Sequence, residues 1–475
     1  MTSTATQSPP RELNLGAALF RVLAGVVAFQ LAYSFHVCSF LAVVYLWSLF
    51  ELTRLKSARQ ASYLGLLIGM LAYAPQMAFM WKIFGPAAIA LWLVLAFWLR
   101  MFLVAGRACR NRFGPLWTAL LVPFLWTGFE YFRSELYYLR FSWLNAGYVF
   151  SHNLGWLPMN YIGVYGMGFL IMSAVAALSL LDWKKQFALG SALLVGLGII
   201  SNAPPIETSP SIVISGNELR VAGVQMEFPG DTEVVFNLNQ LIKKYPGAQL
   251  LVLSEYTFSG PVPESINAWC KKHQRYLVVG AEDPAPGSNY YDTAFVIDPS
   301  GNVVFRQGKC VPIQFFRDGL PARTQALWES PWGKLGFCVC YDLSYTRVTD
   351  QLIRLGAQAI IVPTMDVATW GRHQHELHAR VAPMRAAEYG VPVFRLASSG
   401  ISQCVNASGR EEDTAPMPGD GAMLFGKLGM PKSGSLPWDR VIAPLSVGVT
   451  CIIILWLTLA HYCEKNGSSK HSGPP

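Results

Sequence analysis

Three reactive side chains follow short apolar runs in the second half of the chain. Glu255, Lys309 and Cys340 each come just after a run that is typical of a buried strand. A carboxylate can take a thiol proton, a thiolate can attack a carbonyl carbon, and an ammonium can stabilise the negative charge that develops on the carbonyl oxygen. Burial at a strand end is expected to raise the pKa of the Glu255 carboxyl towards that of a general base. Together the three residues predict an acyl-transfer site.

Each of these residues also has a structural explanation when it is considered alone. Glu255 could cap a helix or lie on the surface, and Lys309 could be a solvated loop residue. Cys340 could be a packed core cysteine, because a cysteine becomes a useful nucleophile only beside a base or a cation. The catalytic interpretation therefore depends on the fold bringing the three strand ends together.

The region around these residues alternates between strand-like and helix-like patterns. Helices are expected at 232–244, 263–273 and 344–355. Such alternation is typical of an α/β domain whose sheets are covered by helices on both faces. The expected strands are 219–224, 250–253, 276–279, 293–297, 303–306, 335–339 and 359–362.

The composition indicates that part of the chain lies in a membrane. Of the 475 residues, 52% are hydrophobic and only 14% are charged, which is too apolar for an ordinary soluble enzyme. Apolar residues are dense over 15–200 and again over 441–462, and the region between them is more polar. The chain is therefore predicted to combine a membrane bundle with a globular domain that is large enough to have its own core.

Eight segments are long or apolar enough to span a bilayer. Positive residues cluster in alternate connections, such as 54–59, 100–112 and 184–185. The positive-inside rule makes these connections and both termini cytoplasmic and places the globular domain on the outer face. The net charge of +8 is thereby explained without a nucleic-acid partner. The predicted spans are 16–34, 37–53, 61–81, 86–105, 115–134, 159–181, 185–202 and 441–462.

The nine cysteines show no regular spacing and do not predict a disulfide framework. Five of them lie in the globular region, an odd number, so at least one thiol is expected to stay free. A thiol that is retained in an oxidising compartment is a pointer to chemistry, although burial alone could protect it.

The order Glu255, Lys309, Cys340, with the cysteine followed by Tyr341 and Asp342, resembles the Glu-Lys-Cys triad of the carbon–nitrogen hydrolase, or nitrilase, superfamily. A domain of this kind before the last of eight spans is similar to the apolipoprotein N-acyltransferase family, and the resemblance covers nearly the whole chain. Further local matches occur in the family's order: Trp126-x3-Glu130-x2-Arg133, Phe141-Ser-Trp143-x3-Gly147-Tyr148, Gly163-Val-Tyr-Gly166, Val221-Ala-Gly-Val-Gln225, Asp366-x3-Trp370-Gly371, His373-Gln-His375, Arg385-Ala-Ala-Glu388 and Arg395-x4-Gly400-Ile-Ser402.

The resemblance implies a particular architecture. An α-helical membrane bundle of eight spans would carry a nitrilase-like α/β domain, an αββα sandwich, inserted before the last span. The implied parts are a seven-span membrane domain at 1–202, a linker at 203–218, a catalytic domain at 219–435, the eighth transmembrane helix at 441–462 and a cytoplasmic tail at 463–475. The implied location is the bacterial inner membrane, with the catalytic domain on the periplasmic face.

The resemblance also implies a reaction. A membrane N-acyltransferase would move an acyl chain from a phospholipid, through a thioester on Cys340, to the N-terminal amine of a diacylglyceryl-cysteine lipoprotein. Glu255 would be the base, Lys309 and the backbone N–H of Tyr341 would stabilise the oxyanion, and Asp342 would support them. No cofactor is implied, and the enzyme is expected to be a monomer. The alternative is a membrane-tethered nitrilase-type amidase or hydrolase that uses water or another amine as the acceptor; a silent scaffold fits the intact triad poorly.

Four more residues are expected to contact substrate or to support the site. Arg385 and Glu388 are three residues apart on an expected helix, which favours a structural ion pair. The four residues are Trp143, Trp370, Arg385 and Glu388.

A histidine-rich segment offers an alternative metal site. His373, His375 and His378, with Glu376, have residue types that bind zinc. The family resemblance accounts for the first two histidines without a metal, so no metal site is predicted.

The sequence departs from the family pattern beside the triad. Asp342 stands where the family usually has a glutamate. The loop after Lys309 is shorter than usual and lacks the family's lid glutamate. Asp318 and Gln314 are the candidates for its replacement.

Overall fold

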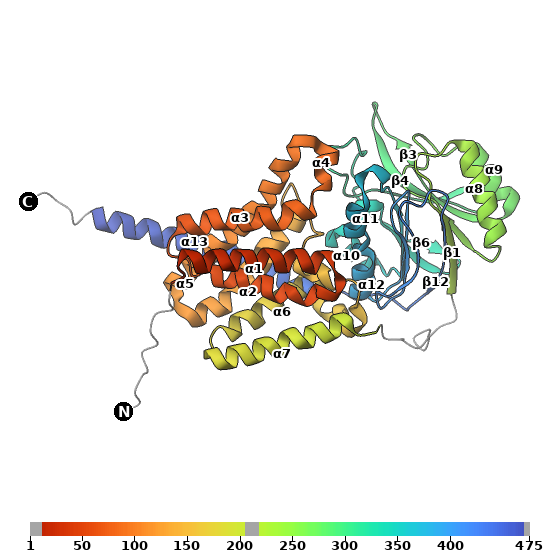
Figure 1. The fold of residues 1–475 in the computed structure, drawn as a ribbon. Helices are drawn as coiled ribbons and strands as arrows, with labels where there is room; N and C mark the ends of the chain where they lie inside the picture. The colour runs from red at the N-terminus through yellow and green to blue at the C-terminus, as the bar shows by residue number, and fades with distance from the viewer. Residues whose placement is uncertain (1–11, 205–217, 470–475) are drawn as a thin grey trace, which may run out of the picture.

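The structure is a computed structural model that describes residues 12–204 and 218–469, with side chains up to 463. A bundle of helices lies at one end of the molecule and an α/β domain at the other, and the last helix returns to the bundle (Figure 1). Most of the predicted linker 203–218 and the end of the predicted tail 463–475 lie outside the described residues.

Four segments of the described chain are long and apolar enough to cross a bilayer: Leu15–Ser34, Phe79–Leu136, Met159–Leu178 and Asp439–Cys463. Polar residues at the start of two other long helices, α3 and α7, lower their hydropathy, so eight spans remain a prediction. The helices of this part are α1 (Leu15–Ser34), α2 (Ala42–Leu52), α3 (Ala58–Gln76), α4 (Phe79–Phe84), α5 (Ala88–Tyr131), α6 (Met159–Leu178), α7 (Trp183–Asn202) and, after the α/β domain, α13 (Asp439–Ser469).

The predicted spans 86–105 and 115–134 fall mostly on the one helix α5, Ala88–Tyr131. Gly114 interrupts the helical backbone there, with a φ of 76°. Glycine tolerates this left-handed value because it has no Cβ. The two predicted spans are therefore separated by a break at one glycine instead of a loop.

The positively charged connections meet at one end of the bundle. The backbone N–H of Leu13 donates to the carbonyl of Arg54 at 3.2 Å, and Arg107 of α5 donates to the carbonyl of Lys56 at 2.6 Å. This end holds the start of α1. The other end of α1 contacts the α/β domain, where Arg380 donates to the backbone of Tyr33.

The α/β domain contains two six-stranded sheets, ordered β12-β1-β2-β3-β4-β5 and β11-β10-β9-β8-β7-β6. The strands β1, β2 and β3, and likewise β7, β8 and β9, are parallel, and the outer strands are antiparallel. The strands are β1 (Glu218–Val224), β2 (Leu250–Val252), β3 (Tyr276–Pro284), β4 (Tyr290–Ile297), β5 (Val303–Gly308), β6 (Trp328–Ser330), β7 (Gly333–Phe337), β8 (Ala359–Thr364), β9 (Val393–Ala397), β10 (Ser402–Val405), β11 (Glu411–Ala415) and β12 (Met423–Gly429).

Alternating side chains hold the layers of this domain together. Leu250 and Val252 of β2 belong to the core between the sheets, whereas Leu251 and Leu253 pack towards the outer helices. In Figure 1, α8 and α9 cover one sheet, and α10 to α12 lie between the other sheet and the bundle. The layers follow the order helix, sheet, sheet, helix, as the resemblance implied. These helices are α8 (Asp231–Lys244), α9 (Glu264–His273), α10 (Thr346–Leu355), α11 (Arg372–Ala379) and α12 (Val381–Tyr389).

Two carboxylates, Glu388 and Asp439, cap the membrane helix α6 where its backbone is interrupted. Gly163 interrupts α6 with a φ of 71°, which leaves the next backbone N–H groups without helical partners. The N–H of Val164 donates to Glu388 at 2.6 Å, and that of Tyr165 donates to Asp439 at 3.0 Å. Glu388 belongs to α12 and Asp439 begins α13, so these contacts attach the α/β domain to the bundle.

Candidate active site

The structure brings the three predicted strand ends together. Glu255 follows β2, Lys309 follows β5, and Cys340 opens a 3-10 helix after β7. The Lys309 Nζ atom lies 2.6 Å from Glu255 Oε1, and the Glu255 carboxylate acts on the Cys340 thiol by raising its pKa. All three side chains are at most 2% exposed. Their catalytic roles stay predictions, but the arrangement that those roles require is present.

Cys340 has an unusual backbone conformation. The predicted strand 335–339 ends early, because β7 stops at Phe337 and the chain turns. Cys340 has a φ of 51°, in the left-handed region that a residue with a Cβ rarely adopts. Such strain is concentrated at functional sites, where the surrounding structure enforces it. The turn presents the thiol to Glu255 and to the carbonyl of Met365, which lies 3.7 Å from the sulfur.

The surroundings of Cys340 and Glu255 favour a neutral thiol and an ionised carboxylate. Burial raises the pKa of Cys340 well above its usual range, Glu255 raises it further, and Lys309 opposes this only in part. For Glu255, burial acts to raise the pKa, but the attraction of Lys309 and several hydrogen bonds lower it overall. The expectation of a raised Glu255 pKa is therefore wrong, because the sequence does not reveal these partners.

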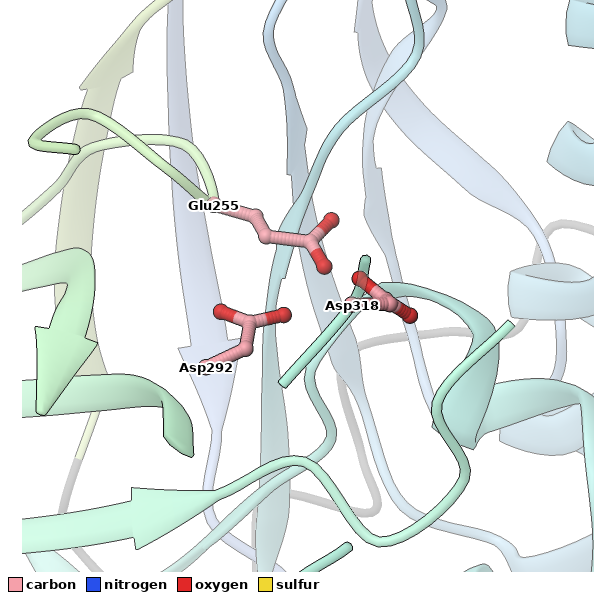
Figure 2. Close-up of side chains that lie close together, drawn as sticks. All are labelled: Glu255, Asp292 and Asp318. Atoms are coloured by element: carbon pink, nitrogen blue, oxygen red, sulfur yellow. The ribbon is translucent and has the colours of Figure 1, made fainter. Parts of the chain in front are cut away.

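Lys309 lies among three carboxyl groups, which Figure 2 shows converging. Its Nζ atom is 2.6 Å from Glu255, 2.8 Å from Asp318 and 3.5 Å from Asp292. Burial acts to lower the pKa of Lys309, but the surrounding acids raise it, so the ammonium stays charged. Asp292 was not predicted. An acidic residue inside the apolar run of β4 is the only signal in the sequence that could have found it.

Asp318, and not Gln314, lies beside the triad. The Asp318 carboxylate accepts hydrogen bonds from the backbone N–H of Ile313 at 2.6 Å and from the hydroxyl of Tyr256 at 3.0 Å. The Gln314 amide instead donates to the carbonyl of Tyr138 in the bundle at 2.8 Å. Of the two candidates for the lid acid, Asp318 therefore has the position that contacts Lys309.

The three acids around Lys309 are also a candidate cation site. One oxygen from each of Glu255, Asp292 and Asp318 lies within 4.8 Å of the others. The Lys309 ammonium lies between these three acids and already neutralises part of their negative charge. The histidine segment is arranged differently: His378 Nδ1 contacts Asp366 at 2.8 Å and its ring stacks on Trp143 at 4.6 Å.

Asp342 ties the loop after Lys309 to the turn at Cys340. Its carboxylate accepts hydrogen bonds from the backbone N–H groups of Cys310 and Val311, at 3.0 and 2.7 Å. Burial raises the pKa of Asp342 to about 6, against the effect of these hydrogen bonds. The shorter acid that departs from the family pattern therefore still bridges two catalytic loops.

Arg385 and Trp143 support the 3-10 helix Cys340–Ser344. Arg385 donates to the carbonyls of Leu343 and Ser344 at 3.1 and 2.9 Å and forms the predicted ion pair with Glu388. Trp143 Nε1 donates to the Ser344 hydroxyl at 2.9 Å. The turn at Cys340 is thus held by the α/β domain and by a loop of the bundle.

An apolar cavity opens at Cys340 between the two parts of the molecule. It is lined by side chains from α4, α5, the loop that holds Trp143, and the catalytic domain. Tyr341 and Trp370, both predicted site residues, contribute to its walls. The principal lining residues are Phe79, Ile83, Leu95, Trp143, Tyr341 and Trp370.

Comparison with known families decides the assignment. Residues 23–177 match the family described as Apolipoprotein N-acyltransferase N-terminal domain, and residues 220–442 match the family described as Carbon-nitrogen hydrolase. The chain belongs to the apolipoprotein N-acyltransferase family. It is therefore an acyltransferase of the carbon–nitrogen hydrolase superfamily and a membrane protein.

Individual relatives extend over most of the chain. An apolipoprotein N-acyltransferase of Azotobacter vinelandii is 24% identical over 453 residues, and the match covers 80% of this chain and 81% of the relative. One of Pseudomonas aeruginosa is 25% identical over 423 residues, and the match covers 78% of this chain and 79% of the relative. Among solved structures, Saccharomyces cerevisiae Nit3 of the nitrilase superfamily is 20% identical, with a TM-score of 0.39 over 46% of this chain and 91% of Nit3.

Proposed function

We propose that this acyltransferase moves an acyl chain from a phospholipid, through a thioester on Cys340, to the N-terminal amine of a diacylglyceryl-cysteine lipoprotein. The family and the names of its relatives support a lipoprotein acceptor. The 2.6 Å contact of Lys309 with Glu255 and the burial of both residues with Cys340 support covalent catalysis.

In the first half-reaction, Glu255 takes the thiol proton while the Cys340 sulfur attacks the ester carbonyl carbon of the phospholipid. The Lys309 ammonium and the backbone N–H of Tyr341 stabilise the oxyanion. The bond from the carbonyl carbon to the glycerol oxygen then breaks. Glu255 gives its proton to that oxygen, a lysophospholipid leaves, and the acyl group stays on the sulfur.

In the second half-reaction, the amine nitrogen attacks the thioester carbonyl, and Glu255 takes a proton from that nitrogen. The carbon–sulfur bond breaks and an amide forms. The proton returns from Glu255 to the Cys340 sulfur, which restores the resting thiol. The two halves consume one ester and one amine and require no cofactor.

The apolar cavity at Cys340 is the observation that carries this proposal. Its walls include residues of α4 and α5 as well as the catalytic domain. An acyl chain that leaves the bilayer needs such walls, because exposing it to water costs about 0.8 kcal/mol for each CH₂ group. A hydrolase for small polar amides, with water as the acceptor, would not need them.

The proposal includes a membrane topology. Eight spans would place both termini in the cytoplasm and the catalytic domain on the periplasmic face of a bacterial inner membrane. The meeting of Arg54, Lys56 and Arg107 at the end of the bundle away from the α/β domain supports this orientation. The protein would act on bilayer-bound substrates as a monomer and without a nucleic-acid partner.

Intact-protein mass spectrometry tests the proposal. Wild-type protein in phospholipid vesicles is expected to gain one acyl mass on Cys340, and a diacylglyceryl peptide is expected to remove it and become N-acylated. Cys340→Ala should abolish both products. Cys338→Ala is a matched control, because Cys338 is also buried but directly follows β7, two residues before Cys340. Fatty acid release without N-acylated peptide would favour the hydrolase, and a wild type that never acylates Cys340 would refute the mechanism.

A further inference from the structure

Asp292 is a buried acid that the proposed mechanism does not use. It lies within β4, its side chain is fully buried, and it points towards Glu255 and Asp318 (Figure 2). One carboxyl oxygen from each of the three residues lies within 4.8 Å of the others. Lys309 Nζ is 3.5 Å from Asp292, so four ionisable groups share one small buried volume.

The three carboxyl groups differ in the donors that they receive. Glu255 accepts hydrogen bonds from the Lys309 ammonium and from a backbone N–H, both at 2.6 Å. Asp318 contacts the same ammonium at 2.8 Å and accepts from a backbone N–H and a tyrosine hydroxyl. Within the described part of the chain, no group donates a hydrogen bond to either carboxyl oxygen of Asp292. Asp292 is thus the acid least stabilised as an anion.

The charge of the cluster requires a proton. Three carboxylates and one ammonium would carry a net charge of −2, and uncompensated charge is costly in a buried site. A proton on one acid halves that charge, and Asp292 is the acid that loses least by becoming neutral. Consistent with this, burial raises the pKa of Asp292 well above its usual range, Glu255 adds to the rise, and Lys309 opposes it.

We propose that Asp292 holds a proton in the resting enzyme and donates a hydrogen bond to Glu255, so that it positions the catalytic base. The inference rests on the proposed function, since it takes Glu255 to be that base. Burial alone would raise the pKa of Glu255, and the attraction of Lys309 and the interaction with Asp292 lower it. A neutral Asp292 therefore keeps Glu255 ionised and ready to accept the thiol proton.

The proposal predicts how the rate depends on pH. Once Asp292 ionises, a second negative charge lies beside Glu255 and competes with it for the Lys309 ammonium. Because the pKa of Asp292 is raised, activity is present below that pKa and is lost as the pH rises through it. The other groups that face it are the acid Asp318, the ammonium of Lys309, which the acids keep charged against the effect of burial, and Tyr256, whose pKa burial raises.

Two substitutions of Asp292 test whether its side chain acts as a neutral hydrogen-bond donor or as an anion. Asp292→Asn has the shape of the neutral acid, so the rate of Cys340 acylation at neutral pH should stay within about threefold of wild type. Its alkaline loss of rate should move up by about one pH unit or more. Asp292→Leu removes the donor, so the rate should fall by roughly tenfold or more and the acid limb should move to higher pH. Asp283→Asn, a surface acid paired with Arg306, should leave the profile unchanged.

Thermal unfolding provides a readout that does not depend on activity. Exchanging a neutral acid for a neutral amide should leave the unfolding temperature of Asp292→Asn within about 2 °C of wild type at pH 7. A fall of about 5 °C or more, or a loss of acylation rate above about 100-fold, would show that the anion is needed and would overturn the proposal. A wild type that never acylates Cys340 would refute the proposed function, and the unfolding comparison would still decide whether Asp292 is neutral.

Discussion

Replacing Asp318 and Gln314 in turn tests which residue fills the position of the lid acid. Asp318 is 7% exposed, and its carboxylate lies 2.8 Å from Lys309 Nζ and 2.6 Å from the backbone nitrogen of Ile313. It therefore joins the loop that follows Lys309 to the ammonium itself. Gln314 lies in the same loop, but its amide hydrogen-bonds the carbonyl of Tyr138 in the bundle. We predict that Asp318→Asn slows acylation of Cys340 and that Gln314→Ala does not.

The size of the effect follows from the contact that is lost. Asp318→Asn keeps the shape of the side chain but removes its charge, and a hydrogen bond between charged groups contributes about 1.5–3 kcal/mol. If that contact positions Lys309 for the transition state, the rate falls roughly 10- to 150-fold. Lys309 keeps its 2.6 Å contact with Glu255, so the loss should be partial. Gln314→Ala removes one exposed hydrogen bond, and its rate should stay within about threefold of wild type.

The assay is the single-turnover rate of thioester formation on Cys340, followed by mass spectrometry in phospholipid vesicles. The unfolding temperature of each variant separates a loosened loop from global unfolding. The assignment of the lid position to Asp318 is wrong if Gln314→Ala slows acylation as much as Asp318→Asn does. It is equally wrong if Asp318→Asn remains within about threefold of wild type.

Two more substitutions test the supports of the site. Gly163→Ala should lower the free energy of unfolding by about 2 kcal/mol or more, because the residue has a φ of 71° and a methyl group would overlap the Asp439 carboxylate; Gly196→Ala in α7, with open space around it, is the control for thermal unfolding. Arg385→Lys should slow acylation roughly tenfold, because lysine cannot bind two carbonyls of the nucleophile turn as the planar guanidinium does. Arg354→Lys, at a 57% exposed arginine, should change neither the acylation rate nor the unfolding temperature. An equal loss of acylation rate in that variant would contradict the role given to Arg385.

The sequence predicted seven of the twelve strands, and the five that it missed include the fully buried strands β9 and β10. The seven predicted strands correspond to β1 to β5, β7 and β8, which are mostly apolar runs. The polar strands β10 and β11 were not predicted, because their pairing depends on the adjacent strand more than on residue preference. The break within α5 was also missed, since the backbone angle of one glycine cannot be read from hydropathy.

The sequence predicted the reactive side chains but not their electrostatics. Glu255, Lys309 and Cys340 could be found because each follows an apolar run. Asp292 could not, because it lies inside such a run and reaches the site only through the pairing of β4 with β3 and β5. The direction of the Glu255 pKa was wrong for the same reason: burial is visible in a sequence, whereas the donors that oppose it come from distant segments.

The charge balance of the site explains how a buried thiol can serve as the nucleophile. Burial and Glu255 keep the pKa of Cys340 high, so the thiol is protonated at rest, while Lys309 holds Glu255 ionised. In the proposed mechanism a thiolate therefore forms only as the sulfur attacks, when negative charge moves onto a carbonyl oxygen that Lys309 can stabilise. All nine cysteines are free, and oxidation of a thiol follows its thiolate character and exposure. The same arrangement that requires attack and proton transfer to occur together thus protects a 2% exposed nucleophile until an acyl donor is bound.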